Sequence, residues 1–171
     1  MTRHLPSADA VPVDTLRLDA FETGLLAVLR HFLTAYAHPD SQSWQAAFQI
    51  AAERWGQARG PQVAMGLLSV LQTLRGARRG PFDFANPLCR TCRTWATGSE
   101  VAFLAMIQAM RRDRTDLARP AVLRLTEGTM DPGLIRAALA FAARHPAGPD
   151  AQTFTPAETS APAPRHLRLV H

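Results

Sequence analysis

Lysine is absent from this 171-residue chain, so all 19 of its strongly basic side chains are arginines. This absence excludes enzymes that form a Schiff base through a lysine amine. Arginine stays charged at neutral pH and binds carboxylate and phosphate groups through a forked pair of donors. A chain rich in arginine and alanine but without lysine is typical of a GC-rich bacterial genome, which predicts a bacterial source.

Long hydrophobic runs are also absent. No stretch reaches the roughly 18 apolar residues that span a membrane, and residues 1–14 lack the apolar segment of a signal peptide. The chain has only two cysteines, spaced as CxxC, which is typical of a reducing compartment and not of a secreted disulfide framework. We therefore expect a cytoplasmic protein without a membrane partner.

Valine and isoleucine are too sparse and scattered for a β-sheet, whereas apolar residues recur at spacings of three and four. This pattern predicts an all-α protein, a compact bundle of five to six helices. Thr97 and Glu100 match a capping box, and Asp131 followed by Pro132 is a typical helix start. A cap at Asp14 or Asp19 and the proline at position 39 predict a first helix that ends at His38. Breaks at proline, glycine and capping residues predict the further helices at residues 40–60, 61–80, 97–110, 116–126 and 132–145.

The same breaks divide the chain into three regions. Residues 1–13 contain proline and serine without periodicity, which predicts a flexible N-terminal arm. Residues 14–146 form the predicted helical domain, which is large enough to fold without disulfides or metals. Residues 147–171 are rich in proline, alanine and threonine, a composition that predicts a disordered tail.

Arginines are concentrated in the middle third of the chain. Between Arg75 and Arg124, ten arginines stand against four acidic residues, whereas the remainder has nine arginines and ten acids. Arginines at helix C-termini also interact favourably with the helix dipole, which is the structural alternative to a binding role. The local excess predicts a face that binds anions or an acidic partner. The residues expected on this face are Arg75, Arg78, Arg79, Arg90, Arg93, Arg111, Arg112 and Arg114.

Both cysteines lie in the stretch NPLCRTCRTWATGSE, residues 86–100. Cys89 and Cys92 have the spacing of half a zinc site, which needs two further ligands. They also have the spacing of a redox dithiol, and Arg90 and Arg93 would favour the reactive thiolate.

A third interpretation of the pair is packing, and it is the one that the sequence favours. Free cysteines are most often small buried hydrophobic residues. The cysteines would then join Phe82, Phe84, Leu88 and Trp95 in an apolar plug that holds residues 81–98 across the bundle.

No known catalytic motif accompanies the cysteine pair. The chain lacks the βαβ pattern of a thioredoxin-like protein, and it has Ala96 where helical peroxidases of the carboxymuconolactone decarboxylase type carry a histidine. GxSxG, HExxH, Walker A and GxGxxG are all absent. A helix-turn-helix is excluded because its would-be recognition helix, VAMGLLSVLQTL, offers almost no polar side chains to bases.

These observations predict a non-catalytic adaptor or regulatory protein. Its arginine-rich face, within residues 75–124, would bind an acidic partner, either a protein or a nucleic acid. The alternative is a thiol-redox or zinc-binding protein centred on Cys89 and Cys92. We expect no cofactor, with zinc at this pair as the alternative.

Overall fold

The structure, a computed structural model, describes residues 9–149 of the chain. Residues 1–8 of the predicted arm (residues 1–13) and residues 150–171 of the predicted tail (residues 147–171) lie outside this range. Within it, the chain is all-α apart from one two-stranded ladder, which confirms the predicted fold class. The elements in chain order are β1 (Val11–Pro12), η1 (Val13–Leu16), α1 (Ala20–Ala37), η2 (Pro39–Ser41), α2 (Ser43–Ala77), η3 (Cys92–Thr94), β2 (Trp95–Ala96), α3 (Gly98–Arg111), α4 (Thr115–Leu125) and α5 (Pro132–Arg144).

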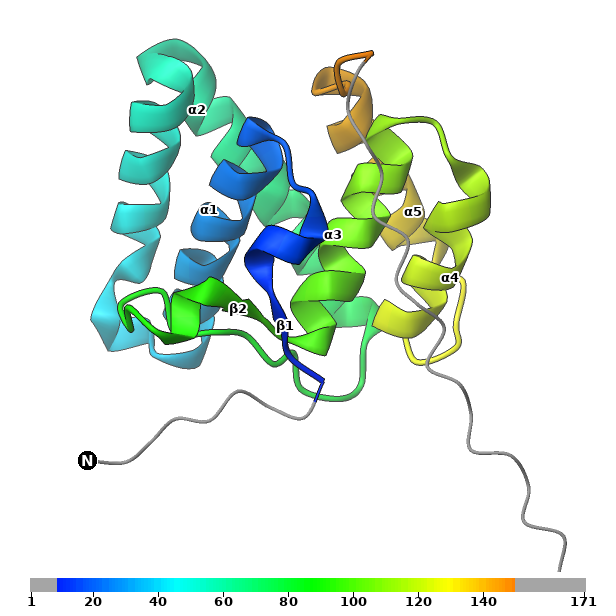
Figure 1. Cartoon of the computed structure of the whole chain (residues 1–171), viewed down its shortest axis with the longest axis horizontal. Coiled ribbons are helices and arrows are strands. Elements are labelled where there is room, and N and C mark those ends of the chain that lie inside the picture. Colours follow the sequence, from blue (N-terminus) through cyan, green and yellow to red (C-terminus); the bar gives the residue numbers. More distant parts are fainter. Residues whose placement is uncertain (1–8, 150–171) are drawn as a thin grey trace, which may run out of the picture.

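The helices pack around one core (Figure 1). Helix α1 lies along α2, α3 lies along α4, and α5 contacts both α2 and α3. The core where they meet consists of fully buried side chains, among them Leu25, Leu29, Leu67, Phe103 and Ile107. Burying such side chains is the main force that holds the helices together, at roughly 1.5–3 kcal/mol for each one.

Three helices begin at the residues that the sequence indicates. Asp19 caps α1 and Thr97 caps α3, each in a capping box completed by the glutamate three residues later. Asp131 caps α5 by accepting a hydrogen bond from the backbone N–H of Leu134, with Pro132 in the first turn. These caps satisfy N–H groups that have no partner inside the helix.

Helix α2 joins the two helices that the sequence predicts at residues 40–60 and 61–80. Its backbone leaves the helical region at Gly56, where φ is +83°, and Figure 1 shows two limbs meeting at a sharp bend. A Cβ atom at Gly60 would lie 2.6 Å from Cα of Ala52 and collide with the Ala51 carbonyl. Glycine at position 60 therefore allows the limbs to approach closely, and Pro61 lies inside α2 instead of opening a separate helix.

The last residues of the predicted arm belong to the folded domain. Val11 pairs with Ala96 and Pro12 with Trp95 in an antiparallel ladder. Leu16, at the end of η1, is 1% exposed and lies in the core. The segment is too short to show a helical or strand period, which is why its sequence resembles a loose arm.

Candidate functional site

Cys89 and Cys92 lie at the surface, on the connection between α2 and α3, where a disulfide joins them. Both cysteines are partly exposed, and Arg90 and Arg93 beside them are exposed. The backbone N–H of Cys92 donates a hydrogen bond to Sγ of Cys89 over 3.1 Å. The disulfide therefore lies in a partly exposed segment, with an exposed arginine directly after each cysteine.

A buried ion pair fixes the position of this connection. The Arg30 guanidinium of α1 binds both carboxylate oxygens of Glu100 of α3, at 2.7 and 3.0 Å. The same guanidinium donates to the carbonyl oxygens of Arg93 and Trp95, at 2.9 and 2.6 Å. Glu100 also accepts the backbone N–H of Ala85 at 3.2 Å. The segments on both sides of the cysteines are therefore held by one ion pair.

The predicted apolar plug is correct for its phenylalanines but not for Leu88. Phe82 and Phe84 pack against the core, and the Phe82 ring meets Phe103 edge-on with 6.4 Å between centroids. Leu88 is 79% exposed. The interpretation of the cysteines as free, buried packing residues is wrong, because they are partly exposed and bonded to each other. The phenylalanines and the Arg30–Glu100 pair hold the connection in place.

The zinc interpretation requires two ligands in addition to the cysteines. Within residues 9–149, no group of three or more histidine, cysteine, aspartate or glutamate side chains could hold a metal ion. The described residues thus provide only the half-site that the sequence shows.

A groove of about 860 Å³ borders the cysteine connection. It lies among β1, η1, α1, α2 and residues 87–95. Its exposed charged residues are Arg54, Arg93 and Asp14, and Arg30 contributes to its lining. The groove is therefore basic, with one carboxylate among its lining residues.

His31 is a further titratable residue that lines this groove. Its Nδ1 lies 2.8 Å from the hydroxyl oxygen of Ser43, and the residue is 8% exposed. Burial lowers the pKa of His31 below its usual value because the charged form is poorly solvated. The hydroxyl partner holds the ring in place at the edge of the groove.

Two arginines expected on the basic face are instead buried in ion pairs. The side chains of Arg111 and Arg112 are 3% and 7% exposed, and both bind the fully buried carboxylate of Glu22. Arg111 also binds Asp19 at 2.9 Å, and Gln108 donates to Glu22 at 2.9 Å. The C-terminal turn of α3 lies against the start of α1, so these charges balance each other and do not form an exposed face.

Two more of the expected arginines are occupied by contacts within the chain. Arg78 donates to the carbonyl oxygens of Gly80, Pro81 and Leu125, so it joins the end of α2 to the end of α4. Arg114 forms an exposed bidentate pair with Asp116, at 3.0 and 2.8 Å. The pKa of Asp116 is lowered chiefly by the hydrogen bond from Arg114.

The remaining four expected arginines are exposed. Arg75 and Arg79 lie at the end of α2 and line a cavity of about 380 Å³, where the Arg75 guanidinium stacks 4.2 Å above the Tyr36 ring. Arg90 and Arg93 lie on the cysteine connection. The predicted basic face thus reduces to these two accessible pairs.

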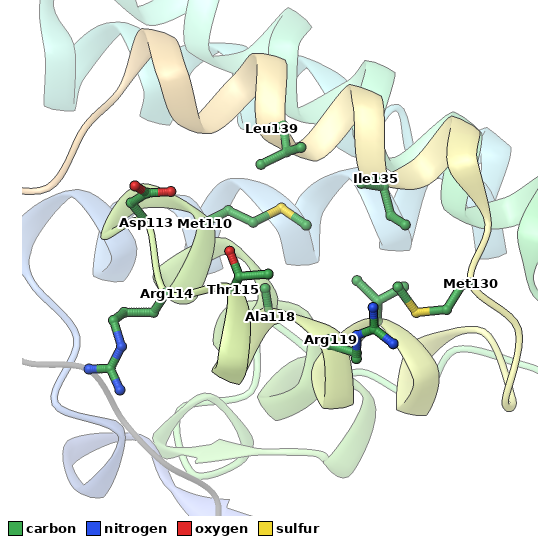
Figure 2. A pocket seen from close by; sticks show the side chains of 10 residues that line it. Met110, Asp113, Arg114, Thr115, Ala118, Arg119, Met130, Ile135 and Leu139 are labelled. Carbon is green, nitrogen blue, oxygen red and sulfur yellow. The ribbon is translucent and has the colours of Figure 1, made fainter.

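Figure 2 shows a smaller pocket, of about 140 Å³, between α4 and α5. Ile135 and Leu139 of α5 extend towards Met110, while the Arg114 side chain extends away from them. The lining of this pocket is mostly apolar, and of its charged residues Arg114 is bound to Asp116. We place the candidate chemistry at the cysteine connection, where the disulfide and its hydrogen bond to a backbone N–H lie.

The sequence interpretation did not place Arg54 or His31 in a site, although both line the groove. Neither residue lies in the basic block, and each is separated from the cysteines by at least 35 positions, so spacing along the chain carries no signal for them.

Comparisons with family models, curated proteins and solved structures find no match for the chain. Among residues 9–149, no helix is both long and apolar enough to cross a membrane.

Proposed function

We propose that the protein exchanges thiol and disulfide with a partner protein through Cys89 and Cys92. The observation that carries this proposal is the disulfide between two partly exposed cysteines, in which Cys89 Sγ accepts a hydrogen bond from the Cys92 N–H. A hydrogen bond to sulfur favours a thiolate over a thiol, and nearby arginines act in the same direction. Cys89 is therefore the nucleophile and Cys92 the resolving thiol.

The exchange starts from the reduced protein and a partner disulfide. The Cys89 thiolate attacks one sulfur of that disulfide, so that a mixed disulfide forms and the first partner thiolate leaves. Cys92, as a thiolate, then attacks Sγ of Cys89 and displaces the second partner thiolate. The two protons lost by the cysteines end on the partner thiols. The partner gains two electrons, and this chain reaches the disulfide form.

Equilibration in glutathione buffers, followed by alkylation and mass spectrometry, tests this function. We expect a two-electron transition with a midpoint between about −300 and −120 mV, the range of exchanging protein dithiols. Cys92→Ser should accumulate a mixed disulfide at Cys89, and Cys89→Ser should not form one at Cys92. Reduced cysteines that remain unchanged in oxidised glutathione would exclude the function.

A second candidate function is binding of an acidic protein segment in the 860 Å³ groove. The supporting observation is that Arg54 and Arg93 are both exposed there, against the single carboxylate of Asp14. Arginine pairs well with carboxylates, and such contacts weaken as salt screens them. This retains the adaptor role that the sequence predicts but assigns it to a surface next to the cysteines.

Binding of a fluorescent polyglutamate peptide at two salt concentrations tests this second function. We expect Arg54→Gln and Arg93→Gln each to weaken binding severalfold, whereas Arg136→Gln, an equal loss of charge on α5, should not. Equal weakening by all three variants would show that binding depends on the net charge of the protein and not on the groove. Tighter binding of a DNA duplex than of the peptide would favour a nucleic acid as the partner.

A further inference from the structure

A second basic cavity, of about 680 Å³, lies between α2 and the end of α5. Its volume falls within the range of small-molecule sites in proteins. The two helices approach closely here, because a Cβ at Gly66 would lie 2.9 Å from the Phe141 ring. The lining residues are Arg59, Pro61, Gln62, Met65, Gly66, Ser69, Arg144 and His145.

His145 is the buried polar side chain of this cavity, with an exposed fraction of 7%. Its Nδ1 lies 3.4 Å from Nη2 of Arg59. A guanidinium only donates hydrogen bonds, so Nδ1 accepts and the ring proton lies on Nε2. Phe21 and Phe141 hold the ring, with centroid distances of 5.1 and 4.8 Å. Within residues 9–149 no hydrogen bond to Nε2 is found, so this N–H is a donor that a ligand can use.

Positive charges surround the imidazole, and none of the residues that line the cavity is acidic. Arg59 and Arg144 are exposed, and neither is ion-paired within the described residues. Arg111, the last residue of α3, donates to the backbone carbonyl of His145 over 2.7 Å. Its charge is balanced by Asp19 and Glu22 of α1.

These arginines also affect the protonation of His145. Burial is the largest cause that lowers its pKa, and Arg59, Arg111 and Arg144 lower it further, to about 4. The ring is therefore neutral at neutral pH and can donate its Nε2 proton without adding another charge. A bound anion would offset the repulsion between the exposed guanidinium groups.

We propose that this cavity binds a phosphate group, as inorganic phosphate or on a small phosphate monoester. The two guanidinium groups of Arg59 and Arg144 would bind separate oxygens, and His145 would donate to a third. Such charge-assisted hydrogen bonds are the strong ones in anion recognition. Met65, which is 55% exposed, gives the remainder of the cavity an apolar surface for the organic part of a monoester.

Calorimetric titration of the full chain with inorganic phosphate, at constant ionic strength, tests the proposal. We expect saturable binding at one site, weakened about tenfold or more by Arg59→Gln or Arg144→Gln. Arg136→Gln removes an equal charge elsewhere on α5 and should change the affinity by less than about twofold. Because the substituted arginines are exposed, circular dichroism should show an unchanged fold for all three variants.

Proton NMR of His145 adds a readout that a distant binding site would not affect. Saturating phosphate should raise the pKa of His145 from its value of about 4, because the anion favours the charged imidazolium. Glycerol phosphate should compete with phosphate for the site. The proposal is overturned if millimolar phosphate does not bind, if binding leaves the His145 resonance unchanged, or if a DNA duplex binds where glycerol phosphate does not.

Discussion

The Glu100 side chain is fully buried and belongs to both a capping box and an ion pair with Arg30. We expect Glu100→Gln to lower the free energy of unfolding by about 3–5 kcal/mol, because the amide leaves the buried Arg30 charge without a counterion. Urea denaturation at pH 7 measures this loss.

Asp116→Asn serves as its control, since it removes a carboxylate from the exposed pair with Arg114. Exposed pairs contribute little to stability, so the denaturation midpoint of Asp116→Asn should hardly change. A loss below about 1 kcal/mol in Glu100→Gln would show that the buried pair contributes no more than a surface pair does.

His145 makes stability depend on pH. Its pKa is about 4 in the folded protein and about 6.5 when unperturbed, so between these values the unfolded chain binds a proton that the folded chain does not. The contribution is complete above about pH 6.5 and is lost as the pH falls to 4, by at most about 3 kcal/mol. Burial lowers the pKa of His31 as well, which acts in the same direction.

Urea denaturation of the wild type and of His145→Gln across this pH range isolates the contribution of His145. We expect a shallower decrease in stability in the variant, because its side chain does not titrate. Parallel pH profiles for the two proteins would show that His145 is equally solvated in the folded and unfolded states.

The bend of α2 depends on Gly60. We expect Gly60→Ala to destabilise the protein by about 1–3 kcal/mol, because the new methyl group would meet backbone atoms of Ala51 and Ala52, which cannot move aside. Gly76 lies in the same helix, and a Cβ added there would meet nothing within 4 Å. Gly76→Ala should therefore stabilise the protein by about 0.5–1 kcal/mol. Thermal denaturation measures both changes, as a lower midpoint for Gly60→Ala and a higher one for Gly76→Ala. Equal shifts of the two midpoints would contradict the close approach of Gly60 to the backbone of Ala51 and Ala52.

The starts of the helices could be predicted because their signals are local. Asp19, Thr97 and Asp131 cap helices through residues three positions away, so the sequence displays each interaction directly. The charge pairs could not be predicted in this way. Arg30 and Glu100 are 70 positions apart, and only the packing of α1 on α3 brings them together.

The same limit applies to the candidate sites. Counting charges locates the basic third of the chain, but it does not show that Arg111 and Arg112 are buried while Arg75 and Arg79 are exposed. The cysteine pair could be identified from its spacing. The groove beside it could not be predicted, because it forms only where α1, α2 and the N-terminal segment meet in the folded chain.

The N-terminal segment closes the folded domain through one buried leucine. Leu16 is 1% exposed, and its carbonyl lies 3.4 Å from the buried amide of Gln108. We expect Leu16→Ala to cost about 2–5 kcal/mol, as for other buried leucines. Leu88→Ala, at a position 79% exposed, should cost far less. Equal effects in chemical denaturation would contradict the placement of Leu16 in the core.

The two capping boxes share an arrangement that affects how the molecule opens. Glu22, at the start of α1, binds Arg111 and Arg112 at the end of α3, while Glu100, at the start of α3, binds Arg30 of α1. Helix ends usually fray and exchange their amide protons quickly. Here fraying of either first turn breaks an ion pair with the other helix. The amide protons of Glu22 and Glu100 should therefore exchange with solvent only when the whole domain unfolds.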